Sequence, residues 1–239
     1  MIGLGSGRSG TTSLTNLLNA QKNSFVVHEG GYIYPKTFRQ AAPIAGDFLP
    51  WEVSLEKLDQ WHQGLVEASE GSRVYGDVSS SFLPYVPAIL ERWPQVKFVC
   101  IKRAREAVVK SFMHVTPGSN LWNKDSSIAG VPDFWSDMYP DMGIEDKEEA
   151  IGAYWDMYYT EAERYERMYP ASFKVFDIDQ LNTVDGKKKI LEHVGFPAED
   201  MQTAVVVHAN KRYFRPLTWF LRALFSLLTN VKRLVSWAR

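Results

Sequence analysis

The chain has 239 residues, enough for one domain with a substantial core, and its 45% hydrophobic and 23% charged residues are typical of a soluble globular protein. The formal net charge is −1, yet residues 201–239 hold seven basic residues and no acidic one. The single cysteine, Cys100, excludes an intramolecular disulfide. A predicted strand starts at residue 2, which leaves no room for a signal peptide or an N-terminal membrane anchor, and we expect a cytoplasmic protein.

A short apolar strand at residues 2–5 leads into a glycine-rich turn, and a helical pattern follows at residues 11–20. Glycines allow positive φ angles and leave room for a bulky anion, and the N–H groups at a helix start point toward such an anion. Arg8 adds a forked cation, and Thr11 and Thr12 add hydroxyl donors. This combination predicts a phosphate-binding loop and therefore a nucleotide ligand.

Two general nucleotide motifs fit this loop incompletely. The P-loop of ATP- and GTP-hydrolysing proteins has a lysine where this chain has Thr11, which argues against an ordinary NTPase. The dinucleotide motif G-x-G-x-x-G is matched by Gly5, Gly7 and Gly10, and Glu29 follows 19 residues after Gly10. The pattern by itself leaves a Rossmann-type NAD(P)-dependent oxidoreductase open.

The sequence GRSGTTSL at residues 7–14 resembles the 5′-phosphosulfate loop of the PAPS-dependent sulfotransferase family, in which R-S-G-T-T is typical. The resemblance implies that PAPS binds here and that Arg8 holds the 5′-phosphate and sulfonate oxygens during catalysis. Thr11 and Thr12 would donate hydroxyl and backbone hydrogen bonds, and Ser9 and Gly10 would offer backbone N–H groups. The predicted nucleotide-binding residues of the loop are Gly7, Arg8, Ser9, Gly10, Thr11, Thr12 and Ser13.

A second segment fits the same resemblance. A buried strand is predicted at residues 96–102, Arg103 follows it, and residues 104–114 have a helical pattern. Ser111 lies eight residues after Arg103, and two helical turns can bring both side chains to one phosphate. This is similar to the family's 3′-phosphate site, which implies that Arg103 and Ser111 distinguish PAPS from ATP.

The other predicted elements alternate along the chain. They are strands at 25–28, 73–78 and 172–178, and helices at about 54–69, 84–92, 145–168 and 187–194. Such alternation predicts a single α/β domain over residues 1–216, with a mostly parallel central sheet flanked by helices. Because ligands bind beyond the carboxyl ends of such strands, we expect the loop, residues 28–29, residues 77–79 and Arg103 at one crevice.

The end of the second strand carries two candidates for the general base that removes the acceptor's proton. Glu29 stands 21 residues after Arg8, and its spacing is similar to that of a glutamate that acts as the base in tyrosylprotein-type sulfotransferases. The resemblance therefore implies Glu29 as the base. His28 is the alternative, because its unperturbed pKa lies nearer neutrality. Alternation along an extended strand would direct the two side chains to opposite sides.

The third strand departs from the family pattern. Many members have a lysine there, in a Glu-Lys-Thr/Ser-Pro sequence, where this chain has Val78. A transition-state cation is missing at this position, which keeps a non-catalytic nucleotide-binding module open. Asp77 is expected to cap the following helix, with a contact to the acceptor as the alternative. The arginines and the helix N-terminus supply the counter-charge, and no histidine has metal-ligand spacing, so no metal is expected.

Three later segments complete the predictions. Residues 115–144 look irregular and contain several aromatic residues, which predicts a flap over the acceptor. Lys211 and Arg212 lie in a basic loop that is predicted to cover the nucleotide. Residues 217–239 form a predicted basic amphipathic helix, whose uncharged core is too short to span a bilayer. Its pattern over 217–237 leaves three roles open: docking on an anionic membrane surface, an oligomer contact, or packing on its own domain.

The predicted activity is transfer of a sulfuryl group from PAPS to a hydroxyl or amine. The acceptor class stays open among small molecules, glycans, lipids and peptides, and nucleic acid is not expected as a partner.

Overall fold

The computed structural model describes residues 1–30, 55–115 and 142–206. Five parallel strands form one sheet in the order β2-β3-β1-β4-β5. The strands are β1 (Ile2–Leu4), β2 (Ser24–His28), β3 (Val74–Val78), β4 (Phe98–Lys102) and β5 (Phe173–Asp177). The predicted α/β class with a parallel central sheet is therefore confirmed, and each observed strand agrees with its predicted range to within two residues at either end.

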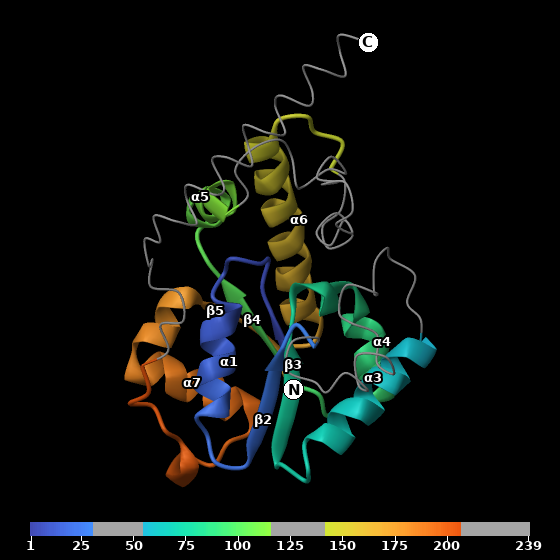
Figure 1. The fold of residues 1–239 in the computed structure, drawn as a ribbon, viewed down its shortest axis with the longest axis vertical. Coiled ribbons are helices and arrows are strands. Elements are labelled where there is room, and N and C mark those ends of the chain that lie inside the picture. The colour runs from blue at the N-terminus through green and yellow to red at the C-terminus, as the bar shows by residue number, and fades with distance from the viewer. Residues whose placement is uncertain (31–54, 116–141, 207–239) are drawn as a thin grey trace, which may run out of the picture.

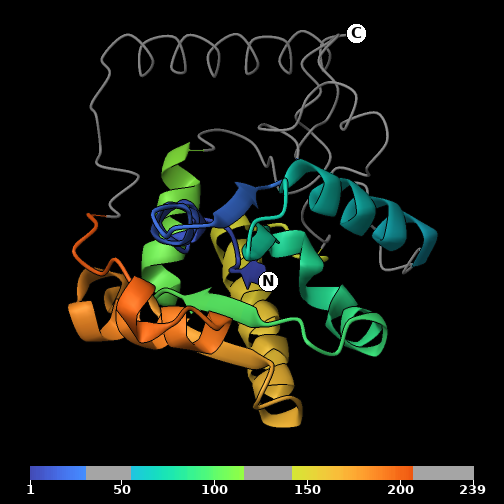
Figure 2. The same ribbon diagram turned by 90° about the horizontal axis from the view of Figure 1, so that it is seen from below.

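Helices pack against two cores, one on each side of this sheet (Figures 1 and 2). One core includes α1 (Thr11–Asn19) and α7 (Val184–Val194). The other core includes α3 (Leu55–Ala68), α4 (Val86–Arg92), α5 (Arg105–Val115) and α6 (Lys147–Met168). Short 3-10 helices are η2 (Ser80–Tyr85), η3 (Ile178–Asn182) and η4 (Ala198–Asp200).

The pleat of β4 divides its side chains between the two cores. Phe98 and Cys100 pack in the core of α6, while Val99 and Ile101 pack in the core of α1 and α7. A strand that is buried on both faces has no solvent side, which explains its continuous apolar sequence. Each such fully buried apolar side chain contributes about 1.5–3 kcal/mol to folding. Cys100 is a free, buried cysteine, and burial raises the pKa of its thiol.

The long helix α6 confirms the predicted helix at 145–168 (Figure 1). Asp146 caps its N-terminus by accepting a hydrogen bond from Glu149 N at 2.8 Å. Its buried face carries tyrosines at 154, 158, 159 and 165. Trp155 on the same helix is only half-buried. Tyr158 and Tyr159, which are neighbours in sequence, are both buried.

Several helices begin one to three residues away from the predicted start, and two of these shifts have a clear local cause. The helix predicted at 84–92 begins as α4 at Val86, because the preceding residues form η2 with Pro84 inside it. The helix predicted at 187–194 begins as α7 at Val184, because the Thr183 side chain accepts from Gly186 N and caps it earlier.

Several predicted features lie outside the described residues. They are most of the predicted flap at 115–144, the basic loop with Lys211 and Arg212, and the C-terminal segment 217–239. Within the described ranges, no helix is long and apolar enough to cross a membrane.

Candidate active site

The loop between β1 and α1 is shaped by three residues with left-handed backbone: Gly7, Arg8 and Gly10 have φ angles of 76°, 53° and 107°. Gly10 is the N-cap of α1, and the first helical hydrogen bond runs from Leu14 N to Gly10 O at 3.1 Å. The N–H groups of the first turn therefore precede the helical ladder and point along the axis toward the loop. The N–H of Gly7 donates to Gly5 O at 2.7 Å, so Gly7 shapes the turn and is not one of these donors.

Two tyrosines of α6 form hydrogen bonds with the first residues of the loop. The hydroxyl of Tyr158 accepts from Gly5 N at 3.1 Å and donates to Ser80 O at 3.2 Å. The hydroxyl of Tyr159 accepts from Ser6 N at 3.4 Å and donates to Ile101 O at 2.7 Å. Burial raises the pKa of both phenols, so each remains a neutral group that donates and accepts. The loop is thereby fastened to the exits of β3 and β4.

The two predicted anion pockets meet at Arg8. Its Nε donates to Ser111 Oγ on α5 at 3.2 Å, and Arg103 Nη1 donates to Arg8 O at 3.0 Å. Trp155 Nε1 on α6 donates to Arg103 O at 2.9 Å and so fixes the backbone where β4 ends. The structure therefore brings the loop and the β4–α5 junction together, as the sequence predicts, with Arg8 as the residue that both Arg103 and Ser111 contact.

The end of β2 lies beside the same loop. His28 Nε2 is 3.0 Å from Thr11 Oγ1, so the imidazole faces the first turn of α1. Burial lowers the pKa of His28, and the neighbouring Glu29 carboxylate opposes this effect. The strand ends at His28, and Glu29 adopts a left-handed φ of 54°. The expectation that these two side chains alternate along an extended strand is therefore wrong at Glu29.

The left-handed backbone of Glu29 singles this residue out. Non-glycine residues pay about 1–2 kcal/mol for this conformation, and such strain concentrates at functional sites. Among the described residues, four non-glycine residues adopt it: Arg8, Asn23, Glu29 and Glu70. Asn23 and Glu70 precede strands, at the amino edge of the sheet, whereas Arg8 and Glu29 follow strands, at the carboxyl edge. The two strained residues at the carboxyl edge, Arg8 and Glu29, thus both have predicted catalytic roles.

Asp77 does not cap the following helix. Ser79 is the N-cap of η2, and its side chain accepts from Ser81 N. Asp77 is fully buried at the end of β3, where it accepts from Trp61 Nε1 and from Gly30 N, each at 3.3 Å. Burial raises the pKa of Asp77 to about 7, against the opposing effect of these hydrogen bonds. The predicted capping role is therefore wrong, whereas the alternative, a contact with the acceptor, stays a prediction.

The Val78 side chain, at the position where many family members have a lysine, is fully buried in the core of α1 and α7. Lys102 forms an ion pair with Glu163 at 2.5 Å. Arg8 lies in the loop, and Arg103 donates a hydrogen bond to its backbone. No group of three or more His, Cys, Asp or Glu side chains in the described part of the chain is placed to hold a metal ion.

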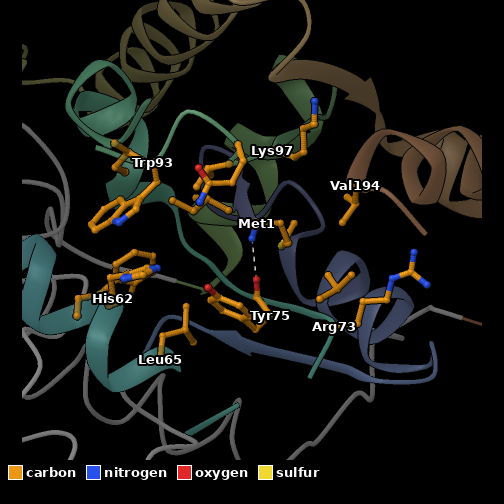
Figure 3. A pocket seen from close by; sticks show the side chains of 14 residues that line it. Met1, His62, Leu65, Arg73, Tyr75, Trp93, Lys97 and Val194 are labelled. Atoms are coloured by element: carbon orange, nitrogen blue, oxygen red, sulfur yellow. Dashed lines mark hydrogen bonds between the residues drawn. The ribbon is translucent and has the colours of Figure 1, made fainter. Parts of the chain in front are cut away.

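A separate cavity of about 150 Å³ opens where the strands begin, at the opposite edge of the sheet (Figure 3). His62 and Trp93 stack at its wall with ring centroids 4.3 Å apart, and Met1 N donates to Tyr75 O at 2.6 Å beside them. Since the loop follows the carboxyl end of β1, this cavity is not part of the candidate active site.

A parallel sheet whose first strand leads through a glycine-rich turn into a helix N-terminus defines an α/β protein of the P-loop type. A family profile described as "Sulfotransferase family" matches residues 1–166, and the chain belongs to this family. Sulfuryl transfer is accordingly the class of reaction that the family and the fold support.

One solved structure supports the fold. A sulfotransferase from Alicyclobacillus acidocaldarius aligns with a TM-score of 0.52 and 16% identity over 95% of this chain and 91% of that chain. A shikimate kinase from Bacteroides thetaiotaomicron aligns with a TM-score of 0.45 and 10% identity over 82% of this chain and 97% of that chain. Among curated proteins, no significant match was found.

Proposed function

We propose that this protein transfers a sulfuryl group from PAPS to a hydroxyl or amine of an acceptor, with Glu29 as the general base. The observation that carries the proposal is the meeting of Arg8, Arg103 and Ser111 at the loop, with the strained Glu29 at the same edge of the sheet. The matched family supports the reaction class. The donor, the base and the acceptor are our inference.

The residues at the loop fit a ligand that carries an anionic group at each end. The first turn of α1 and the Thr12 hydroxyl suit the 5′-phosphate, and Arg103 with Ser111 suits the 3′-phosphate. Arg8 lies between these groups, because its Nε already reaches Ser111. Its guanidinium can therefore turn from Ser111 toward the sulfonate oxygens when the nucleotide binds.

PAPS supplies the sulfuryl group: the acceptor oxygen or nitrogen forms a bond to sulfur while the bond from sulfur to the 5′-phosphate oxygen breaks. The Glu29 carboxylate takes the proton that the acceptor loses. Arg8 and the N-terminus of α1 stabilise the negative charge that develops on the bridging and equatorial oxygens. His28, held against Thr11, is the alternative proton acceptor.

Isothermal titration with PAP and with NAD tests the nucleotide. We expect PAP to bind and Arg103→Ala to weaken it about 10–100-fold, because a charge-assisted hydrogen bond contributes about 1.5–3 kcal/mol. Arg73→Ala is the matched control, since Arg73 is exposed at the opposite edge of the sheet. Binding of NAD without PAP would contradict the proposal and favour an oxidoreductase.

The acceptor is found by incubating the protein with PAPS and separate pools of phenols, glycans, lipids and peptides, followed by mass spectrometry for the gain of one SO₃ group. We expect one pool to be modified. PAP binding without transfer to any pool would instead support a non-catalytic nucleotide-binding module, for which the buried Val78 is the structural reason.

Gly10→Ala tests whether the loop itself binds the nucleotide. A Cβ at Gly10 would lie 2.9 Å from Ile178 Cδ1, at a φ of 107°. We expect PAP affinity to fall about tenfold or more, which corresponds to about 1.4 kcal/mol. Gly71→Ala is the control, because Gly71 has a φ of 79° and no atom lies within 4 Å of an added Cβ. This variant therefore has the backbone strain without a steric clash. Equal PAP affinities of the two variants in titration calorimetry would place the nucleotide elsewhere.

A further inference from the structure

Two hydrogen bonds to β3 hold the turn that carries Glu29. Glu29 N donates to Val78 O at 3.0 Å, and Gly30 N donates to Asp77 Oδ1 at 3.3 Å. The first bond uses backbone groups and is available to any sequence. The second depends on the Asp77 side chain, which is therefore the side chain that fixes the residue after the strained glutamate.

The second oxygen of Asp77 is used as well. Trp61 Nε1 on α3 donates to Asp77 Oδ2 at 3.3 Å, and the Trp61 ring packs at 4.8 Å from that of Phe82 in the core. An ionised carboxylate accepts on both oxygens and so matches two N–H donors. An amide or a protonated acid presents a donor on one side, which would face Trp61 or Gly30. The buried pair of donors is thus specific for the carboxylate form.

We infer that Asp77 is a positioning residue: its ionised carboxylate holds the left-handed turn that presents Glu29 to the acceptor. This inference rests on the proposed role of Glu29 as the base. Asp77 is fully buried and acts through the turn, without touching the acceptor itself.

The charge state of Asp77 gives the inference a measurable pH dependence. Burial raises the pKa of Asp77 from 3.8 to about 7, and Glu29 adds to this rise, while hydrogen bonds from Trp61, Gly30 and Val78 lower it. Among the described residues, Glu29 is the charged group whose electrostatic effect changes the pKa of Asp77. The folded protein keeps the Asp77 proton up to higher pH than the unfolded chain does. This contribution to the free energy of unfolding is complete below about pH 4 and is lost as pH rises to about 7.

The opposite trend is expected for turnover. The form that matches both donors is the carboxylate, so kcat should rise with pH through an apparent pKa near 7. Asp77→Asn should lower kcat about 10–100-fold, as expected for a base that is displaced by a fraction of an ångström. It should also abolish the rise of kcat with pH near pH 7. Its affinity for PAP should be unchanged.

The test measures PAP release from PAPS, with the acceptor pool that the wild type modifies, from about pH 5.5 to 9. This range covers both the protonated and the ionised form of Asp77. Asp59→Asn is the control, because Asp59 is an exposed aspartate on the same helix as Trp61 and pairs with Arg92. Trp61→Phe is the second variant. It removes one of the hydrogen bonds that the Asp77 carboxylate accepts, so the rise of kcat should move to higher pH. If kcat of Trp61→Phe rose at the same or a lower pH than that of the wild type, the inference would be overturned. This result decides the matter even if Asp77→Asn does not fold.

Amide hydrogen exchange at Gly30 provides a readout that does not depend on transfer. We expect faster exchange in Asp77→Asn and, in the wild type, slower exchange above pH 7 than the intrinsic increase with pH predicts. If Glu29→Gln inactivates the protein while Asp77→Asn keeps the wild-type kcat and pH profile, the positioning role is overturned and the proposed function stands. If Glu29→Gln is fully active, the base assignment falls, and the positioning role falls with it.

Discussion

Glu29→Gln should reduce kcat for sulfuryl transfer about 10²–10⁴-fold, which is the usual contribution of a positioned general base. Glutamine has nearly the same shape but cannot take the acceptor's proton. Affinity for PAP should be unchanged, because the nucleotide is held by the loop, Arg103 and Ser111. The measurement is PAP release from PAPS with the modified acceptor pool, together with titration calorimetry of PAP.

Glu70→Gln is the matched control for this variant. Glu70 is also a glutamate with left-handed backbone, at a φ of 46°, but it lies in an exposed turn before β3. The same chemical change in the same backbone conformation should therefore leave transfer unaffected. If Glu29→Gln kept its rate and His28→Gln lost it, the role of base would belong to His28, whose imidazole faces Thr11.

The shape of the loop between β1 and α1 could be predicted from sequence because its determinants are local. Positive φ angles at Gly7 and Gly10 and the helix start at Thr11 depend on neighbouring residues, and all three agree with the sequence pattern. The strands could be predicted for a related reason. A parallel strand with helices on both faces must be apolar along its whole length, as β4 shows.

The residues that support the site could not be predicted in this way. Asp77 and Trp61 are 16 positions apart, and Tyr158 and Gly5 are 153 positions apart, so their hydrogen bonds depend on how the elements pack. An aspartate at the end of a strand most often caps a helix, and that local rule failed because η2 is capped by Ser79. The adjacent tyrosines of α6 were the available signal, because a buried phenol needs a hydrogen-bond partner.

The left-handed turn at Glu29 shows the same limit. Glutamate has no local preference for this conformation, and the sequence therefore predicts an extended residue. In the structure, two hydrogen bonds from successive N–H groups to β3 impose the turn. Tertiary contacts thus determine where the predicted base lies, whereas the sequence identifies only which residue it is.

Arg8→Ala should lower kcat about 10²–10³-fold, the cost of removing one preorganised donor from the charge that develops in the transition state. The effect should lie at the upper end, because Val78 provides no second cation at the exit of β3. PAP affinity should fall less than kcat does, since Arg103 and Ser111 remain. Alanine keeps a Cβ at the φ of 53°, so the backbone strain of the loop is unchanged and thermal unfolding should be near that of the wild type.

Two further variants separate charge from geometry at this position. Arg8→Lys keeps the charge without the planar fork and should recover only part of the rate. Arg105→Ala removes an arginine of α5 that is paired with Asp156 at 3.1 Å, and it should transfer sulfuryl groups at the wild-type rate. If Arg8→Ala kept its rate, the guanidinium that contacts Ser111 would serve only to hold the loop. The transition-state charge would then have to be met by Arg103 and the N-terminus of α1, because Lys102 is paired with Glu163.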